Sequence, residues 1–139
     1  MGSAIAFLIA ATSLDNIVLV NRSKEKALGT ALDISNTVSI DSPVSVIGTD
    51  DYSKIKNSEL VIISASAGSL ATSRMDLLEQ NVALIKDIAK KIKQYSHDSK
   101  ILIVTNPLDI VTYIFQKEGS YQKEKVIGIA GNLDSSRFR

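Results

Sequence analysis

Two side chains, those of Asn106 and Arg74, lie at sequence positions from which they could bind an oxygen-rich ligand. Asn106 follows the apolar run ILIV and precedes Pro107, and the bond between them could be cis. An amide at the end of a parallel strand can donate a hydrogen bond to a substrate oxygen. Arg74 opens a long amphipathic segment after a loop of Gly and Ser, where a guanidinium could polarise a substrate carbonyl. The alternative for Arg74 is an exposed arginine at a helix start.

Asp134 and Arg137 form a second pair with possible chemistry. They lie three residues apart, so a helix that begins near Leu133 would put both on one face. Such a pair is usually a surface ion pair. Alternatively, Arg137 binds a carboxylate in a bidentate manner and Asp134 orients a catalytic imidazole. The single histidine, His97, lies in the polar stretch QYSHDSK and is interpreted as an exposed loop residue at the opposite end from this site.

The first residues carry a possible nucleotide site. Gly2 stands directly before a helix, as the last glycine of a G-x-G-x-x-G turn would, although a simple helix cap is the alternative. Asn21 ends the next strand near the spacing expected for a ribose-binding residue. In Asn21-Arg22-Ser23 the guanidinium and the hydroxyl could bind a 2′-phosphate, which predicts NADP rather than NAD. Alternatively, Asn21 is a turn residue, Arg22 is solvated and Ser23 caps a helix.

Strands and helices alternate along the chain. Short apolar runs typical of strands buried between helices lie at 16–21, 44–48, 60–66, 101–106 and 126–130. The helices expected around them are a buried, Ala-rich one at 3–12, then 24–36, 74–95 and 110–117, and the start of another after Gly131. This alternation predicts an α/β fold with a doubly wound parallel sheet, whose ligands bind beyond the carboxyl ends of the strands.

The composition narrows the possible partners and location. With 139 residues and a net charge of +1, the chain has the size of one domain and no charge bias toward nucleic acid or an anionic membrane. It contains no cysteine, which excludes disulfides and favours the reducing cytoplasm. The apolar opening is too short to span a bilayer and lacks a basic flank. One histidine and no cysteine leave no evident set of metal ligands.

Five segments, in order along the chain, resemble the lactate/malate dehydrogenase family. They are GSAIAFLI, NIVLVNRSKEKALGTALDI, SRMDLLEQN, ILIVTNPLDIVTY and VIGIAGNLDSSRFR, of which TNPLD and LDSSRFR are the most specific. The resemblance implies a Rossmann-type dinucleotide-binding domain over residues 1–130 and the start of a substrate domain at 131–139. It also implies reversible hydride transfer between NADP or NAD and a 2-hydroxy/2-oxo acid, in a homodimer or homotetramer.

The resemblance implies a role for each catalytic and substrate-binding candidate. Arg74 matches the loop arginine that polarises the substrate carbonyl, and Asn106 matches the substrate-binding asparagine. Asp134 matches the partner of the catalytic histidine. Arg137 matches the arginine that grips the substrate carboxylate.

The resemblance also implies a set of cofactor contacts. Gly2 matches the last glycine of the dinucleotide fingerprint, and Asn21 occupies the place of the ribose-binding aspartate. The further cofactor-binding residues are Arg22, Ser23, Ser64, Ala65, Asn81, Thr105 and Asn106.

Departures from the family pattern limit these expectations. The first strand and the first two fingerprint glycines are not in the sequence, and His97 cannot replace the catalytic histidine. In the order 3-2-1-4-5-6 strand 1 is central, so its neighbours would expose unpaired edges. The expectation is therefore a truncated fragment that is marginally folded and catalytically silent.

Substrate and function class have alternatives. Residues 65–73 contain no basic residue for a second carboxylate, so malate is the first choice from overall similarity alone and lactate is the second. A non-catalytic nucleotide-binding module is the alternative reading. Glycosidases that use NAD and a metal are a third, and the sequence shows no metal ligands for them.

Overall fold

The computed structural model describes residues 1–38, 43–68 and 73–138, with only the backbone for Arg74 and for residues 132–134. The chain forms two compact units, Met1–Lys56 and Asn57–Arg139. Within the described ranges, no helix is both long enough and apolar enough to span a bilayer. The predicted loop of Gly and Ser before Arg74 lies partly outside the described residues.

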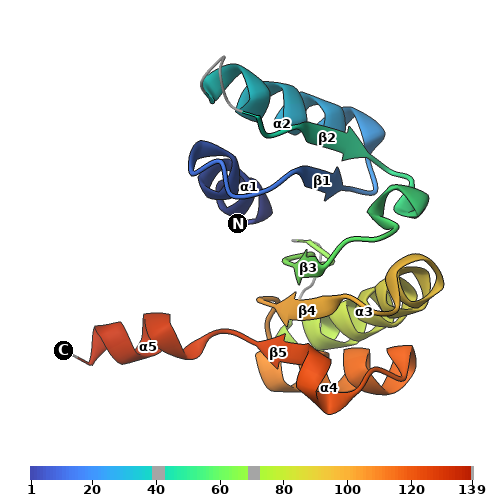
Figure 1. The fold of residues 1–139 in the computed structure, drawn as a ribbon. Helices are drawn as coiled ribbons and strands as arrows, with labels where there is room; N and C mark the ends of the chain where they lie inside the picture. Colours follow the sequence, from blue (N-terminus) through green and yellow to red (C-terminus); the bar gives the residue numbers. More distant parts are fainter. Residues whose placement is uncertain (39–42, 69–72, 139) are drawn as a thin grey trace. The chain divides into compact units, whose positions relative to one another are not determined.

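The first unit is a two-stranded parallel sheet with two helices (Figure 1). Its elements are α1 (Gly2–Ala11), β1 (Ile17–Val20), α2 (Lys24–Thr37), β2 (Val46–Thr49) and the 3-10 helix η1 (Tyr52–Ile55). Its core combines two alanines and one isoleucine from the helices with branched side chains: Ala6, Ala10 and Ile34, against Ile17, Leu19, Val38, Val44 and Val46. Phe7 and Leu8 of α1 are exposed, so this helix is not buried all round as predicted.

Helix α2 lies unusually close to the sheet. Ser23 starts the helix by accepting a hydrogen bond from the Lys26 N–H at 3.2 Å, as the capping alternative predicted. Ala27 of α2 is buried, and a Cβ added to Gly48 of β2 would lie 2.1 Å from the Ala27 carbonyl oxygen. Only glycine at position 48 permits this approach of the helix backbone to the strand.

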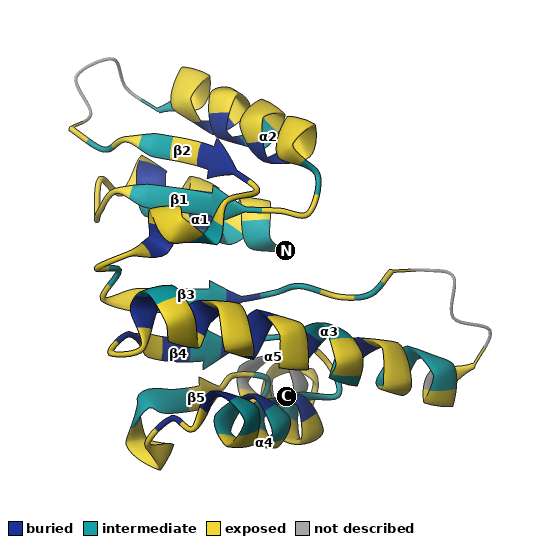
Figure 2. Ribbon diagram, turned by 90° about the vertical axis from the view of Figure 1, so that its right-hand side faces the viewer, coloured by how far each residue is buried: buried dark blue, intermediate teal, exposed yellow. Residues whose placement is uncertain are grey.

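The second unit is a three-stranded parallel sheet in the order β3-β4-β5, with α3 and α4 packed together against it. Its elements are β3 (Leu60–Ile63), α3 (Arg74–Ser96), β4 (Lys100–Ile103), α4 (Leu108–Gly119), the 3-10 helix η2 (Lys123–Lys125), β5 (Val126–Gly128) and α5 (Gly131–Arg137). In Figure 2 the buried residues of α3 recur along one side of the helix, and the lysines of this helix are exposed. The predicted amphipathic pattern is confirmed.

The two faces of the second sheet differ in burial. Ile101 and Ile103 of β4 are fully buried, and burial of each side chain is expected to stabilise the fold by about 1.5–3 kcal/mol. Leu102 points to the opposite face, is only half-buried, and aligns with Ile127, which is exposed. The prediction that the 101–106 strand is buried on both faces is therefore only half right, because α3 and α4 pack on each other and so cover one face.

Buried hydroxyls fix the end of α3 that lies away from Arg74. The hydroxyls of Ser96 and Ser99 share a hydrogen bond at 2.5 Å, and the Ser58 carbonyl accepts the remaining hydroxyl proton of this pair. Tyr121, which follows α4, donates to the Ser96 carbonyl at 3.1 Å. Burial, followed by the charge of Asp98, raises the pKa of Tyr121, so its hydroxyl stays protonated as a donor at neutral pH.

The topology agrees with the predicted fold class. Parallel strands alternate with helices, and the described strands form the groups β1-β2 and β3-β4-β5. These are the 3-2 and 4-5-6 parts of the order 3-2-1-4-5-6. Among the described residues β1 pairs only with β2 and β3 only with β4, as expected for a sheet without strand 1.

The strands of the second unit end earlier than predicted. The runs 60–66, 101–106 and 126–130 leave the sheet after Ile63, Ile103 and Gly128. Beyond β3 and β4 the chain forms hydrogen bonds with side chains, which are described below. Beyond β5 the Ile129 N–H still donates to the Ile103 carbonyl at 2.9 Å. Helix α4 starts at Leu108, earlier than predicted, because Pro107 is its N-cap residue. The helices η1 and η2 were not predicted.

We expect Gly48→Ala to destabilise the first unit by about 1–3 kcal/mol, because the added Cβ would collide with the α2 backbone. The matched control is Gly29→Ala in α2, where an added Cβ meets nothing within 4 Å. That variant should be more stable than the wild type by about 0.5–1 kcal/mol. Urea unfolding followed by circular dichroism measures both, and equal stability of the two variants would contradict the close approach.

Candidate functional site

Two loops meet at the carboxyl end of the second sheet. The main chain continues from β4 through Val104, whose N–H donates to the Ile63 carbonyl at 2.9 Å. Thr105 is buried, and its hydroxyl donates to the Ala65 carbonyl at 2.8 Å. The predicted cofactor contacts Ala65 and Thr105 are thus joined directly, and Ser64 precedes them at the end of β3.

Asn81 links these loops to α3. Its side chain is 1% exposed. The carboxamide oxygen accepts from the Ala67 N–H at 2.8 Å and from the Ser66 hydroxyl at 3.4 Å. The carboxamide nitrogen donates to the Asn106 carbonyl at 2.9 Å. One side chain therefore bridges the loop after β3 and the loop after β4.

The backbone of Asn106 is fixed by a hydrogen bond, and its side chain is exposed to solvent. The peptide bond from Asn106 to Pro107 is cis, as the sequence allowed. The Asn106 side chain is exposed, and no hydrogen bond to its carboxamide is recorded among the described residues. Its amide is therefore available to a ligand at the edge predicted for the site.

Arg74 begins α3, the helix that also carries Asn81. Arg74 is the first residue of α3, and Ser73 caps the helix by accepting from the Asp76 N–H at 3.0 Å. Arg74 precedes Asn81 by seven residues, so its backbone lies on the same helix face, about 10 Å along the axis. The Arg74 side chain lies outside the described residues.

Helix α5 follows the end of β5 and leads away from it in Figure 1. Asp134 and Arg137 both lie within this helix, one turn apart, so the predicted i,i+3 spacing on a helix is present. Arg137 is exposed, and the Asp134 side chain lies outside the described residues.

His97 occupies the other end of the second unit. It is the C-cap residue of α3, its side chain is 73% exposed, and it lies 3.2 Å from Asp98. Since β4 begins just after it, His97 is at the amino end of the strand whose carboxyl end carries Asn106. The prediction of an exposed residue at the opposite end is confirmed.

The predicted nucleotide residues of the first unit lie on its strand and helix ends. Gly2 is the first residue of α1, and Met1 provides no side-chain cap. The N-terminus of a helix offers free N–H groups and the positive end of the helix dipole to an anion. Because α1 leads by a short turn into β1, Gly2 lies toward the edge at which Asn21 follows β1.

The segment Asn21-Arg22-Ser23 is a turn closed by its own side chains. The Asn21 carboxamide oxygen accepts from the Ser23 N–H at 3.0 Å. Arg22 is exposed, and no ion pair of its guanidinium is recorded among the described residues. The turn and capping alternatives for Asn21 and Ser23 are observed, and they leave the Asn21 NH₂ group and the Arg22 guanidinium facing solvent.

Glu25 adds a negative charge to this turn. Ser23 donates its hydroxyl to the Glu25 carboxylate at 2.9 Å. Hydrogen bonds from its own backbone N–H and from the Ser23 hydroxyl hold the pKa of the Glu25 carboxyl below its ordinary value. Glu25 is therefore ionised at neutral pH, next to the position predicted to receive a ribose.

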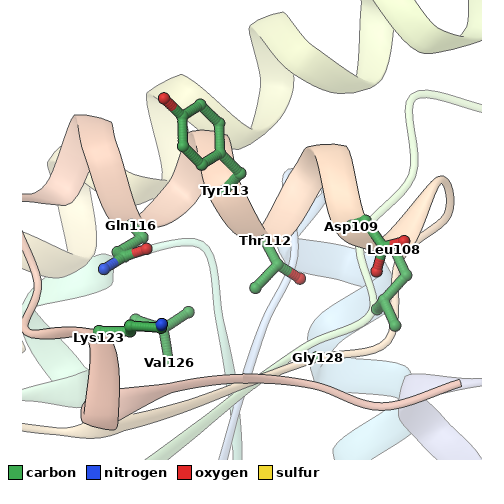
Figure 3. A pocket seen from close by; sticks show the side chains of 8 residues that line it. All are labelled: Leu108, Asp109, Thr112, Tyr113, Gln116, Lys123, Val126 and Gly128. Atoms are coloured by element: carbon green, nitrogen blue, oxygen red, sulfur yellow. The ribbon is translucent and has the colours of Figure 1, made fainter.

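A groove of about 290 Å³ lies between α4 and β5 (Figure 3). Its lining residues are Leu108, Asp109, Thr112, Tyr113, Gln116, Lys123, Val126 and Gly128. The Thr112 hydroxyl is buried, and no hydrogen-bond partner for it is found in the described part of the chain. The groove contains none of the predicted site residues.

Two features of the site were missed from the sequence. One is the bridging role of Asn81, which a polar residue between Leu78 and Ile85 on the apolar stripe of α3 could have indicated. The other is the carboxylate of Glu25, two residues after the helix cap. An acid in the first turn of a helix is common, so its sequence signal is weak.

Comparisons with known proteins agree with this arrangement. Residues 1–128 match the family described as "lactate/malate dehydrogenase, NAD binding domain". A malate dehydrogenase from Archaeoglobus fulgidus is 39% identical over 142 residues, which cover 100% of this chain and 48% of that protein. The chain thus spans about half the length of this curated relative.

Solved structures give the same result. The structure of that Archaeoglobus fulgidus enzyme in complex with NADH has a TM-score of 0.91 at 39% identity, covering 99% of this chain and 48% of that one. The Cryptosporidium parvum lactate dehydrogenase with lactic acid and nicotinamide adenine dinucleotide has a TM-score of 0.92 at 37% identity, covering 99% and 44%.

The parallel α/β units, the TNPLD segment at the end of β4 and the family match over residues 1–128 lead to one conclusion: the chain belongs to the lactate/malate dehydrogenase family and represents its NAD-binding domain.

Proposed function

We propose that this chain is the dinucleotide-binding part of an oxidoreductase that transfers a hydride between a nicotinamide cofactor and a 2-hydroxy acid. Residues 1–130 form the cofactor-binding part, and residues 131–139 begin the substrate domain. Malate/oxaloacetate is the first choice of substrate and lactate/pyruvate the second. We also propose a homo-oligomer, and a cytoplasmic location because cysteine is absent.

The observation that supports this proposal is the exposed Asn106 carboxamide at the carboxyl edge of β4. Its backbone is fixed by Asn81, and its amide can donate to a substrate oxygen. Arg74 starts α3 on the same helix face as Asn81, from where its guanidinium would polarise the substrate carbonyl. A nicotinamide bound at this edge would supply the hydride chemistry, while Asn106 and Arg74 would hold and polarise the substrate oxygen.

Helix α5 supplies the remaining proposed roles. Arg137 would bind the substrate carboxylate through two parallel N–H donors. Asp134 would orient an imidazole that gives or takes the proton of the substrate hydroxyl. His97 does not fit this role, because it lies at the amino end of β4.

This set of roles predicts no turnover of oxaloacetate or pyruvate by the 139 residues alone, because they lack a histidine near Asp134. Oxidation of NADH and NADPH, followed by absorbance, measures it. Turnover that survives in His97→Ala would contradict the need for a further imidazole.

A non-catalytic nucleotide-binding module is the second candidate, and the position of His97 favours it. The same assay on a longer natural protein that contains this chain discriminates the two. Dinucleotide binding with oxaloacetate or pyruvate turnover supports the enzyme, and binding without turnover supports the module.

We further propose that NADP is preferred over NAD. Asn21 carries no charge where an acidic residue would repel a 2′-phosphate, and the neighbouring Arg22 guanidinium faces solvent. Ser23 can rotate its hydroxyl toward a phosphate only by giving up its bond to Glu25. The preference therefore depends on the balance between Arg22 and Glu25.

We expect Arg22→Ala to lower the ratio of NADPH to NADH affinity roughly ten- to a hundredfold, since one charge-assisted hydrogen bond is worth about 1.5–3 kcal/mol. Fluorescence titration with both cofactors measures the ratio. Lys24→Ala is the matched control, because it removes the same charge two residues away. An equal effect of both variants would indicate net charge rather than a contact.

Glu25→Gln is expected to change the ratio in the opposite direction. It removes the ionised carboxylate while keeping a hydrogen-bond acceptor for the Ser23 hydroxyl. The same titration should show NADPH affinity rising severalfold, with NADH affinity nearly constant. Parallel changes for both cofactors would contradict a role of Glu25 at the 2′ position.

A further inference from the structure

We propose that Asn81 is a positioning residue that acts through Asn106. Its buried carboxamide joins the loop after β3 to the loop after β4 and so fixes where the Asn106 amide is presented. This inference rests on the proposed function, in which Asn106 meets the ligand. Asn81 itself would not touch the substrate.

The hydrogen-bond network fixes the orientation of the Asn81 carboxamide. The Ala67 N–H is a donor and must face the carboxamide oxygen, while the Asn106 carbonyl is an acceptor and must face the nitrogen. If the amide were reversed, its NH₂ group would face the Ala67 N–H and its oxygen would face the Asn106 carbonyl. Two donors would then oppose each other, and so would two acceptors. The two loops therefore require a side chain with one acceptor and one donor in this order.

Burial makes this requirement strict. Asn81 is 1% exposed, so water does not replace a lost partner. A buried polar group left without its hydrogen bond has lost its contact with water and gained nothing in return. In this conformation the oxygen and one N–H of the Asn81 carboxamide are engaged within the protein, and the predicted contact of Asn81 with the cofactor stays a prediction.

The consequence is local to the loops. The sheet hydrogen bonds of β3 and β4 do not involve Asn81, and the apolar packing of α3 rests on Ile85, Ile88 and Ile92. Loss of the bridge should free residues 64–67 and 104–106 while the sheet stays folded. The cost should appear in ligand binding more than in global stability.

Asn81→Asp tests this role through its pH dependence. A protonated carboxyl can accept from Ala67 and donate to the Asn106 carbonyl, whereas an ionised one opposes that carbonyl with a negative oxygen. The contacting residues Ser66, Ala67 and Asn106 do not titrate near neutral pH. Along α3 the nearest charged residues are the exposed Glu79, two residues away, and Asp76 and Lys86, each five residues away, while Arg74 begins the helix two turns before Asn81. Burial raises the pKa of a carboxyl, so the bridge should be present at low pH and lost as pH rises through that pKa.

The experiment compares the full chain as wild type, Asn81→Asp and Gln80→Glu. Gln80 is the exposed neighbour on α3, so Gln80→Glu makes the same amide-to-acid change without touching the bridge. NADH affinity is titrated by fluorescence at a series of pH values. Amide exchange of Ala67 and Ile103 is followed by NMR in the same samples.

For Asn81→Asp we expect NADH affinity near that of the wild type at low pH and roughly ten- to a hundredfold weaker once the carboxyl ionises. Ala67 should lose protection in parallel, while Ile103 in β4 stays protected. Gln80→Glu should follow the wild type at every pH.

Other outcomes overturn the inference. Constant NADH affinity of Asn81→Asp across the pH series would show that the bridge does not position the site. Joint loss of protection at Ala67 and Ile103 would make Asn81 a residue of general stability. If the wild type itself binds no NADH, the proposed function fails, and the exchange at Ala67 still reports separately whether Asn81 holds the loops.

Discussion

The parallel ladder of β3, β4 and β5 is the constraint on which the candidate site depends. Its register aligns Ile63 with Ile103 and Ile103 with Gly128. Ile63 and Ile103 are buried, and α4 contacts β4 and β5. Gly128 has no side chain, and a Cβ there would come within 2.9 Å of the Thr112 hydroxyl of α4. The ladder ends all three strands at one level, so the loops that follow β3 and β4 leave the sheet side by side. Only this proximity allows a single side chain of α3 to bond both loops.

The first unit shows a different principle, in which one short segment serves folding and recognition together. Ser23 caps α2, and the Asn21 carboxamide closes the turn that precedes it. Both residues are therefore partly committed before any nucleotide arrives. What they leave for a ligand is set by the solvent-facing Arg22 and by the charge of Glu25. The proposed preference for NADP therefore depends on local electrostatics rather than on shape.

The sequence was sufficient to predict the features that follow from periodicity and from turn chemistry. Apolar runs located the strands, and the spacing of Ile85, Ile88 and Ile92 located the buried side of α3. Ser23 was recognisable as a cap because a hydroxyl directly before a helical pattern has few other uses.

The strand ends and the site contacts were less predictable, because they depend on partners distant in sequence. Ala67 and Asn106 share Asn81, although they lie 14 and 25 residues from it. No local pattern encodes such a bridge. The relation of Arg22 to Glu25 was missed for the opposite reason, since acids near helix starts are too common to single one out. The exposed face of β4 escaped prediction because continuous apolar sequence does not say whether a helix covers it.

Helix α3 also sets the spacing between two of the candidate site residues, Arg74 and Asn81. It runs for 23 residues, about 35 Å, as one uninterrupted rod. Its last turn is anchored by the buried hydroxyls of Ser96 and Ser99 and by Tyr121, and its first residue is Arg74. Since Arg74 and Asn81 belong to this one rod, their backbones keep a fixed spacing of about 10 Å along its axis. The helix therefore sets the distance between the start of α3 and the bridge to Asn106.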